Sequence, residues 1–187
     1  FEEKYKEHHR EKYPEDIEKI LASGKTPAGS HRPICVKEIL NILGLKPGQT
    51  GLDATLGYGG HARELLRRIR PGGRLFALDV DPFEIVRTEA RLRAEGFSEA
   101  ELIIRRFNFA GSSKLISETD GGFEFILADL GVSSMQLDDP SRGFTFKNEG
   151  PLDLRLNPQR GQSALLLIRS LSEKKLEEIL RLHSDEP

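Results

Sequence analysis

The sequence has a single cysteine, Cys35, among its 187 residues. One thiol excludes an internal disulfide framework and any cysteine-based metal cluster within one chain. We therefore expect Cys35 to pack in the interior, where a free cysteine behaves as a small apolar side chain. No metal site is expected.

Long hydrophobic runs are also missing. The longest aliphatic stretch covers residues 164–168, whereas a membrane-crossing helix needs about 20 apolar residues. No stretch near the beginning has the features of a signal peptide. We expect a soluble protein of the cytoplasm, or of an organelle if the source is a eukaryote, with no membrane partner.

A strong charge of either sign is absent as well, since the formal net charge is −2. Domains that hold a phosphate backbone by charge alone carry a clear basic excess. If RNA is a substrate, the positive surface that contacts it must therefore be local or lie elsewhere.

The composition, 37% hydrophobic and 31% charged, suits one core of ordinary domain size with an appendage. Residues 1–30 are interpreted as a charged N-terminal extension and a linker. A solvated surface is the favoured interpretation of such mixed charge, and an RNA-contacting arm is the alternative. The chain starts at Phe1 and stops at Pro187 directly after a helical pattern, so we expect a truncated chain.

From residue 36 onward, segments with the spacing of strands alternate with segments that have the spacing of helices. The first is a helix from residue 36 to residue 43, with Gly44 as its stop signal. Hydrophobic strands that alternate with helices indicate an α/β fold with a parallel sheet covered on both faces. The expected strands are residues 50–55, 74–79, 101–107 and 123–129, and the expected helices are 62–69, 82–96 and a short one after residue 107.

Residues 130–162 break this alternation. They are polar and punctuated by glycine and proline, and compact domains seldom carry so long an irregular segment without a functional reason. Two helices are expected after it, at residues 163–171 and 173–183, with Ser172 as an N-cap between them.

The turn after the first expected strand is rich in glycine. A nucleotide cofactor laid across the carboxyl ends of a parallel sheet needs glycine there, because a Cβ would hold the ligand away from the backbone. Gly57, Gly59 and Gly60 meet that need. Asp79, 22 residues after Gly57, is placed to accept hydrogen bonds from ribose hydroxyls, with Asp81 as a rival.

Two cofactors compete for this turn. A nicotinamide-dependent oxidoreductase, binding NAD, is one interpretation, but no third glycine follows Gly60 as the dehydrogenase fingerprint requires. The acidic Asp53, four residues before Gly57, instead resembles the first motif of class I methyltransferases. Such a carboxylate suits a cofactor that bears an α-amino group, either directly or by bracing the loop.

Five further motifs occur together and in order. They are residues 31–34 (HRPI), 55–61 (TLGYGGH), 129–138 (DLGVSSMQLD), 142–146 (RGFTF) and 150–156 (GPLDLRL). In combination they resemble the family of bacterial small-subunit ribosomal RNA (cytosine-N4)-methyltransferases, of the MraW/RsmH type.

The resemblance implies a Rossmann-like fold and a set of residues that bind S-adenosylmethionine. Asp79 would hold the ribose and Phe109 would lie beside the adenine, where an aromatic ring can stack on a purine. The open alternatives are that Phe109 belongs to the core and that His61 only caps or packs at a helix start. The full set implied is Gly59, Gly60, His61, Asp79, Phe109, Asp129 and Gln136.

The resemblance also implies how the chain is organised. Residues 31–135 would be the N-terminal part of the cofactor-binding core, and residues 136–187 the long loop and the beginning of an inserted helical substrate-recognition domain. Similar enzymes continue well past residue 187, through the rest of that domain and into further strands of the sheet.

Methyl transfer from a sulfonium needs no metal, and positioning supplies much of the rate enhancement. We hypothesise that Asp129 bridges the cofactor and the target amine, with holding the cofactor alone as the alternative. His31 is a second catalytic candidate, or else a packing residue. A truncated module that binds the cofactor or RNA without catalysis is the non-enzymatic alternative.

The implied partner is small-subunit ribosomal RNA or an assembled 30S-type particle, and a homodimer is a further expectation. The target base must be single-stranded or splayed out to reach a pocket. Basic side chains of the long loop either contact RNA phosphates or form ion pairs that fold the loop. These are Arg142, Lys147, Arg155 and Arg160.

Overall fold

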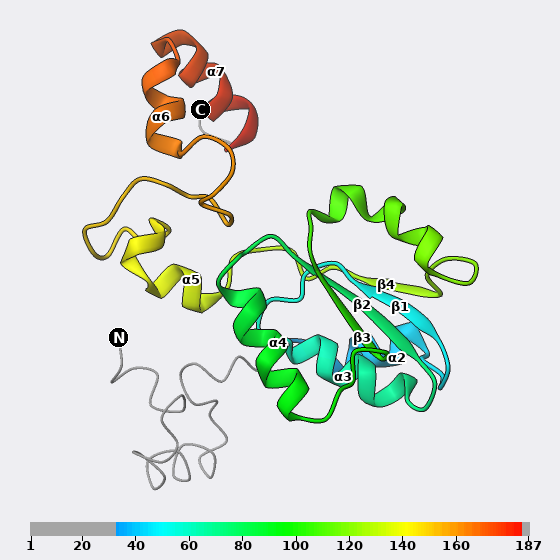
Figure 1. Ribbon diagram of the computed structural model, residues 1–187. Helices are drawn as coiled ribbons and strands as arrows, with labels where there is room; N and C mark the ends of the chain where they lie inside the picture. The colour runs from blue at the N-terminus through cyan, green and yellow to red at the C-terminus, as the bar shows by residue number, and fades with distance from the viewer. Residues whose placement is uncertain (1–32, 185–187) are drawn as a thin grey trace, which may run out of the picture. The chain divides into compact units, whose positions relative to one another are not determined.

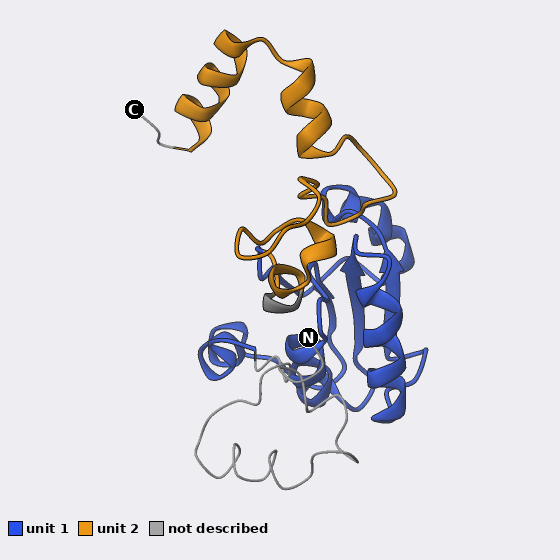
Figure 2. Ribbon diagram, turned by 90° about the vertical axis from the view of Figure 1, so that its left-hand side faces the viewer, with its two compact units in different colours: residues 1–131 blue, residues 132–187 orange. Residues whose placement is uncertain are grey.

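A computed structural model of the chain describes residues 33–184. The chain divides into two compact units, Phe1–Gly131 and Val132–Pro187, which Figure 2 colours separately. The predictions for residues 1–30 and for His31 lie outside the described residues.

Within the described residues, the strands of the first unit form one four-stranded parallel sheet (Figure 1). The strand order is β3-β2-β1-β4, so the predicted α/β fold with a parallel sheet is confirmed. The chain runs outward from β1 to β3 and then returns to the other side of β1. Ligands of such sheets bind at the carboxyl ends of the strands where the order reverses, here between β1 and β4. The strands are β1 (Thr50–Asp53), β2 (Arg74–Asp79), β3 (Leu102–Arg106) and β4 (Phe125–Leu127).

Helices fill the connections between the strands. The strand β2 has the predicted bounds, whereas α3 begins two residues before the predicted start because Gly59 caps it in a left-handed conformation. The helix α2 ends at Gly44, as predicted, which has a φ of 56°. The elements are α2 (Val36–Leu43), α3 (Gly60–Ile69), α4 (Glu84–Ala94) and the 3-10 helix η2 (Phe109–Glu118).

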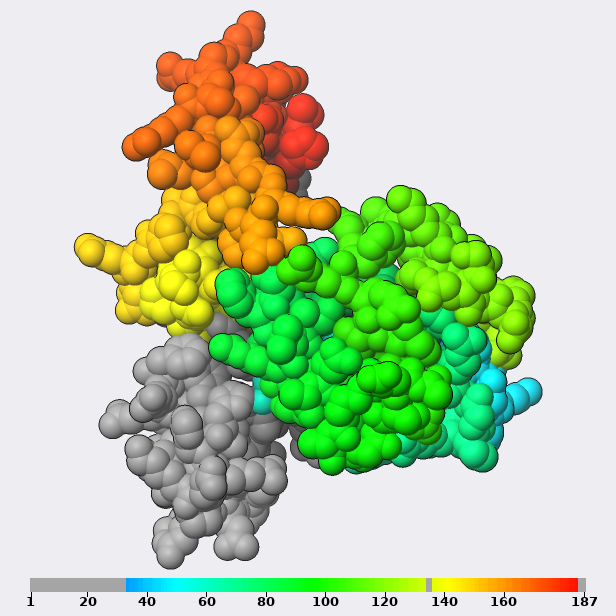
Figure 3. Space-filling view, viewed as in Figure 1, coloured from blue at the N-terminus to red at the C-terminus, as the bar shows by residue number. Residues whose placement is uncertain are grey.

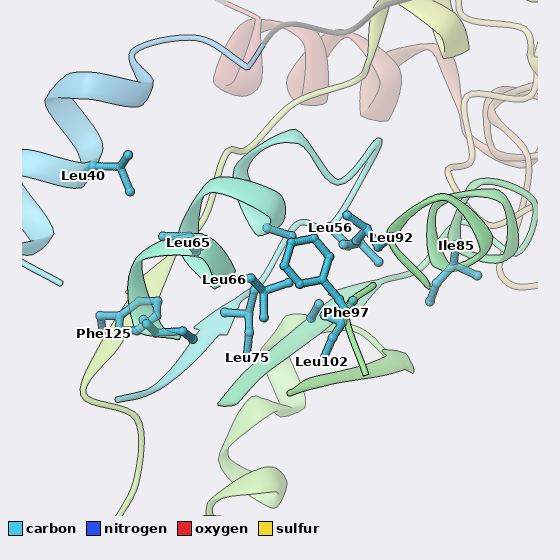
Figure 4. Close-up of a cluster of buried hydrophobic side chains, with 13 residues drawn as sticks. Leu40, Leu56, Leu65, Leu66, Leu75, Ile85, Leu92, Phe97, Leu102 and Phe125 are labelled. Atoms are coloured by element: carbon cyan, nitrogen blue, oxygen red, sulfur yellow. The ribbon is translucent and has the colours of Figure 1, made fainter. Parts of the chain in front are cut away.

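Side chains of the sheet alternate between two apolar clusters, one on each face. In β2, Leu75 and Ala77 pack with α3 and α4 (Figure 4), while Phe76 and Leu78 pack with Leu115 of η2 on the opposite face. The larger cluster also contains Leu40, Leu56, Leu65, Leu66, Ile69, Ile85, Leu92, Phe97, Leu102 and Phe125.

Two expectations about packing need correction. Cys35 does not pack in the interior: it is exposed, directly before α2. The second face of the sheet is covered less completely than predicted, because Ile126 in the edge strand β4 is 58% exposed.

The second unit begins with the short helix α5 (Ser134–Asp138) and the 3-10 turn η3 (Pro140–Arg142). The helices α6 (Ala164–Ser170) and α7 (Glu173–His183) follow, and neither contains a buried residue. The predicted N-cap is confirmed, since the Ser172 side chain accepts a hydrogen bond from Lys175 N. Among residues 33–184, no helix is both long and apolar enough to cross a membrane.

An ion pair and hydrogen bonds to backbone carbonyls hold the long loop. Arg155 Nε lies 2.6 Å from Asp153 Oδ1, and Arg155 also donates to the carbonyl oxygen of Gly161. This pairing lowers the pKa of Asp153, first through the hydrogen bonds from Arg155. Arg142 Nη2 donates to Leu156 O at 2.8 Å. For Arg155 the structure therefore matches the interpretation that an ion pair folds the loop, while Arg142 holds the loop through a backbone carbonyl.

Candidate cofactor site

The turn between β1 and α3 lies at the carboxyl end of the sheet. Leu56 N donates to Leu78 O of β2 at 2.7 Å, which ties the start of the turn to the neighbouring strand. Gly59 N then donates back to Leu56 O at 2.8 Å and closes the turn. Gly57 and Gly59 have φ angles of 47° and 81°, in the left-handed region that favours glycine.

The three glycines of the turn serve different purposes. A Cβ at Gly59 would lie 2.8 Å from Thr88 Cγ2 of α4, and one at Gly60 would lie 2.8 Å from Pro33 Cδ. Only at Gly57 is the Cβ direction open, with Thr55 O at 3.8 Å as the nearest atom. The expected reason, access for a ligand, therefore applies to Gly57, whereas Gly59 and Gly60 allow the close approach of protein atoms.

Asp79 ends β2 and binds the turn directly. Its Oδ2 accepts a hydrogen bond from Gly57 N at 2.7 Å, and its Oδ1 accepts one from Asp81 N at 2.9 Å. Burial raises its pKa, although these backbone hydrogen bonds act in the opposite direction. Since each carboxylate oxygen can accept more than one hydrogen bond, Asp79 retains acceptor capacity for ribose hydroxyls.

The rival Asp81 has another task. It is fully buried, and its Oδ1 accepts hydrogen bonds from Phe83 N at 2.9 Å and Glu84 N at 3.2 Å. These are the first backbone groups of α4, which have no partner within a helix. Asp81 therefore anchors the start of α4, and Asp79 is the better candidate for a ligand.

Asp53, at the end of β1, is a buried carboxyl with one unsatisfied oxygen. Its Oδ1 accepts a hydrogen bond from Thr55 N at 3.0 Å, while its buried Oδ2 has no hydrogen-bond partner among residues 33–184. Burial raises the pKa of Asp53 to about 6, opposed by the hydrogen bond from Thr55 and by His61. A positively charged group next to Oδ2 would stabilise the ionised form.

His61 and Asp129 approach one another across this end of the sheet. His61 is buried, its Nε2 lies 3.0 Å from Ile34 O, and its Nδ1 lies 3.6 Å from Asp129 Oδ2. Asp129 N donates to Thr55 Oγ1 at 2.8 Å, which fixes Asp129 beside the turn. The side chain of Asp129 is 38% exposed, so solvent or a ligand can reach its carboxylate.

Phe109 is not part of the core. It is the first residue of η2 and is 45% exposed. The surface that η2 forms is lime green in Figure 3. The core position belongs to Phe107 instead, whose ring packs with the smaller cluster and whose N–H donates to Asp79 O at 2.8 Å. The alternative interpretation of Phe109 as core is therefore wrong.

Gln136 lies in the second unit, on α5. Its Oε1 accepts a hydrogen bond from Ser133 N at 2.9 Å, and Gln136 N donates to Ser133 Oγ at 3.2 Å. This reciprocal pair is a capping box, which stabilises a helix start. The part of Gln136 in cofactor binding stays a prediction.

Two residues of α4 that were not predicted from the sequence, Thr88 and Arg91, contact the turn. Thr88 Oγ1 donates to Gly57 O at 2.6 Å, and Arg91 Nη2 lies 3.4 Å from Tyr58 O. Their spacing along one helix face was visible, but nothing in the local sequence showed which turn that face contacts. Among residues 33–184, no group of three or more His, Cys, Asp or Glu side chains could hold a metal ion.

Comparison with known proteins identifies related sequences. Residues 28–187 match the model of the MraW methylase family. Ribosomal RNA small subunit methyltransferase H 1 of Lachnoclostridium phytofermentans is 56% identical over 100% of this chain and 51% of its own length. Ribosomal RNA small subunit methyltransferase H 2 of Alkaliphilus metalliredigens is 52% identical over 100% of this chain and 53% of its own length. The chain thus spans about half the length of the curated relatives it matches.

Solved structures are more distant. A SAM dependent methyltransferase from Aquifex aeolicus is 22% identical, with a TM-score of 0.36 over 40% of this chain and 38% of its own. A protein-L-isoaspartate O-methyltransferase is 15% identical, with a TM-score of 0.45 over 52% of this chain and 29% of its own. Similarity at this level says nothing about function. The fold is assigned from the strand order of the sheet, β3-β2-β1-β4.

Proposed function

Because the chain belongs to the MraW methylase family, we propose that it is the cofactor-binding part of an enzyme that methylates the N4 amine of a cytosine in small-subunit ribosomal RNA. The family predicted from the motifs is confirmed, and with it the methyltransferase class. The activity, substrate and partners of the whole protein are proposed because the chain covers about half of its curated relatives.

The observation that carries the proposal is the polar environment around the turn. S-adenosylmethionine supplies an activated methyl group on a positively charged sulfur and also carries an α-amino group. The buried Asp53 braces the turn through Thr55 N and favours a positive charge nearby, and the open Cβ direction at Gly57 leaves space beside the backbone. The residues therefore fit the cofactor.

Each predicted binding residue has a part in this proposal. Asp79 accepts hydrogen bonds from the ribose hydroxyls, and the exposed ring of Phe109 stacks on the adenine. Gly59, Gly60 and His61 form the start of α3. The first N–H groups of a helix attract negative charge, so they suit the carboxylate of the cofactor. Gln136 is assigned to the same site from the family resemblance.

Asp129 is the proposed catalytic residue. The lone pair of a cytosine N4 amine is delocalised into the ring, so the amine is a poor nucleophile. A carboxylate that accepts a hydrogen bond from this amine localises the lone pair and afterwards receives the proton. Asp129 suits this role because it is accessible and is held in place by Thr55. His31 stays a second candidate.

The substrate class is proposed from the relatives, whose names describe small-subunit ribosomal RNA methyltransferases. The target cytosine must leave its helix or lie in a single strand to reach Asp129. Naked RNA and an assembled 30S-type particle are both candidate substrates, in the bacterial cytoplasm where ribosomes are made. The homodimer stays a prediction.

The alternative with NAD is weakened by family membership and not by the turn. The third position of the dehydrogenase fingerprint is Ala62, which is fully buried, and such folds accept alanine there, so the turn alone does not discriminate. Family membership favours the methyl donor instead. A module without catalysis remains the other alternative, because the chain covers half of its relatives.

Methyl transfer tests the proposal directly. Small-subunit particles and naked ribosomal RNA from a strain that lacks the relative's gene are incubated with labelled S-adenosylmethionine and this chain. The full-length Lachnoclostridium phytofermentans relative serves as the positive control. We expect label on a cytosine N4 whenever the second half of the protein is supplied, and its loss with Asp129→Asn. Full turnover by the Asp129→Asn variant would reject the catalytic role of Asp129. Label on an atom other than a cytosine N4 would reject the proposed target.

A further inference from the structure

The helix α4 contacts the cofactor turn through two side chains. Thr88 is fully buried, and its Oγ1 donates to Gly57 O at 2.6 Å. Arg91 Nη2 donates to Thr88 Oγ1 at 2.6 Å and to Tyr58 O at 3.4 Å, and its guanidinium lies 3.5 Å from the centre of the Tyr58 ring. Two consecutive carbonyl groups of the turn are therefore held from the same helix.

Glu84 completes this arrangement one turn before Thr88. Its Oε1 accepts a hydrogen bond from Arg91 Nη2 at 2.9 Å, and its side chain is largely buried. The Thr88 hydroxyl thus accepts from Arg91 and donates to Gly57, so both of its hydrogen-bonding functions are used. Chains of hydrogen bonds that include a charged donor are stronger and more rigid than isolated ones.

The geometry of the peptide bond connects these contacts with the ligand side of the turn. In a planar trans peptide, the C=O of one residue and the N–H of the next point in opposite directions. Holding the carbonyls of Gly57 and Tyr58 therefore fixes the directions of the N–H groups of Tyr58 and Gly59. Gly59 N is the donor that closes the turn on Leu56 O.

The backbone of Gly57 is held by hydrogen bonds from a strand and from a helix. Its N–H donates to Asp79 Oδ2 of β2, and its C=O accepts from Thr88 of α4. Gly57 is also the position where the Cβ direction is open to a ligand. The conformation that a cofactor meets is thus set by one residue of β2 and by two of α4.

We infer that Thr88 and Arg91 are positioning residues, which hold the glycine turn in the conformation that binds the adenosine cofactor. This inference rests on the proposed function only for the identity of the ligand. Neither side chain needs to touch the cofactor. Their contribution is to remove alternative turn conformations before binding, which increases affinity by preorganisation.

Substitutions of Thr88 separate positioning from packing. Thr88→Val keeps the side-chain volume against Gly59 and removes the hydroxyl, whereas Thr88→Ser keeps the hydroxyl and removes the methyl group. If the hydrogen bond holds the turn, we expect Val to weaken binding of S-adenosylhomocysteine by about tenfold and Ser to stay within about threefold of the parent. If packing of the methyl group alone mattered, Ser would weaken binding more than Val.

Arg91→Lys is paired with Arg87→Lys as its control. Arg87 is on the same helix, 3.9 Å from Glu84, with 66% of its side chain exposed. We expect Lys at position 91 to weaken binding, because an ammonium cannot stack on the Tyr58 ring as a planar guanidinium does. We expect Lys at position 87 to have no effect.

The experiment measures calorimetric affinity for S-adenosylhomocysteine and amide hydrogen exchange of residues 56–60 without ligand. Thr88→Val is expected to accelerate exchange of the Gly59 amide by about fivefold or more, while Thr88→Ser retains the parent rate. Equal affinity and equal exchange in the Val and Ser variants would overturn the inference. If the parent chain does not bind the ligand, the proposed function fails, and the exchange rates still decide whether α4 holds the turn.

Discussion

Replacing Asp53 by asparagine is expected to change how the stability of the protein depends on pH. Asp53 is 1% exposed, and within the described part of the chain its Oδ2 has no hydrogen-bond partner. Burial raises its pKa from 3.8 to about 6, against the hydrogen bond from Thr55 N and the charge of His61. The ionised carboxylate is therefore less stable in the folded protein than in the unfolded chain.

The magnitude follows from the two pKa values. The unfolded chain releases this proton near 3.8 and the folded protein near 6, so the folded state binds more protons between these values and its stability falls as the pH rises. The cost is absent below about pH 3, grows through the interval and is complete above about pH 7. At about 1.36 kcal/mol per pKa unit, it reaches about 3 kcal/mol, of which about 1.4 kcal/mol arises between about pH 5 and about pH 8.

Asparagine removes this dependence. The amide oxygen of Asp53→Asn can still accept from Thr55 N, while the amide nitrogen takes the place of Oδ2 and costs about 1–3 kcal/mol at every pH. We therefore expect the variant to gain about 1.4 kcal/mol relative to the parent between about pH 5 and about pH 8.

Urea unfolding followed by circular dichroism at several pH values measures this difference. Asp120→Asn is the matched control, because Asp120 is an exposed carboxyl on a turn, and its curve is expected to run parallel to that of the parent. Parallel curves for the parent and Asp53→Asn would refute the argument that burial dominates at Asp53.

Three further outcomes are expected. Gly59→Ala abolishes ligand binding because its Cβ would meet side chains of α4. Gly96→Ala, at a similar φ in open space, lowers the free energy of unfolding in urea by only about 1–2 kcal/mol and leaves ligand binding intact. Equal ligand affinity in the two variants would contradict this explanation. Ser172→Ala lowers the helix content of the second unit and reduces its free energy of unfolding by about 1 kcal/mol. An unchanged circular dichroism spectrum and an unchanged unfolding midpoint would show that the Ser172 cap does not stabilise α7. Hydrogen bonds from Arg70 lower the pKa of Glu101 to about 2, so Glu101→Gln lowers the melting temperature at pH 7 and less as the pH falls toward 2; the same loss at both pH values would count against this pairing.

The sheet could be predicted because its signals are local. The strand β2 has the predicted bounds since a glycine pair precedes an apolar run that ends at Asp79. The helix α3 buries Leu65, Leu66 and Ile69 at the spacing that the sequence shows. The burial of residues near α2 was harder to predict. Cys35 is exposed because the chain turns there, with a φ of 51°, before the helix begins.

The site could be predicted only in part, because several roles depend on distant contacts. Asp79 and Asp81 are both acidic and only two residues apart, and their separate tasks arise from the position of α4. The sequence indicated glycine at 59 and 60 for access, whereas α4 and Pro33 occupy those Cβ positions. Thr88 acts on a turn 31 residues away, which no local pattern predicts.

The most direct test of the account is to follow the backbone amides of the chain by nuclear magnetic resonance during titration with S-adenosylhomocysteine and, separately, with NAD. We expect the first ligand to shift the amides of Gly57, Gly59, Gly60 and His61 together with that of Asp81, and NAD to leave them unchanged. Saturating S-adenosylhomocysteine without shifts at these residues, or shifts with NAD alone, would contradict the claim that this turn and Asp79 form the methyl-donor site.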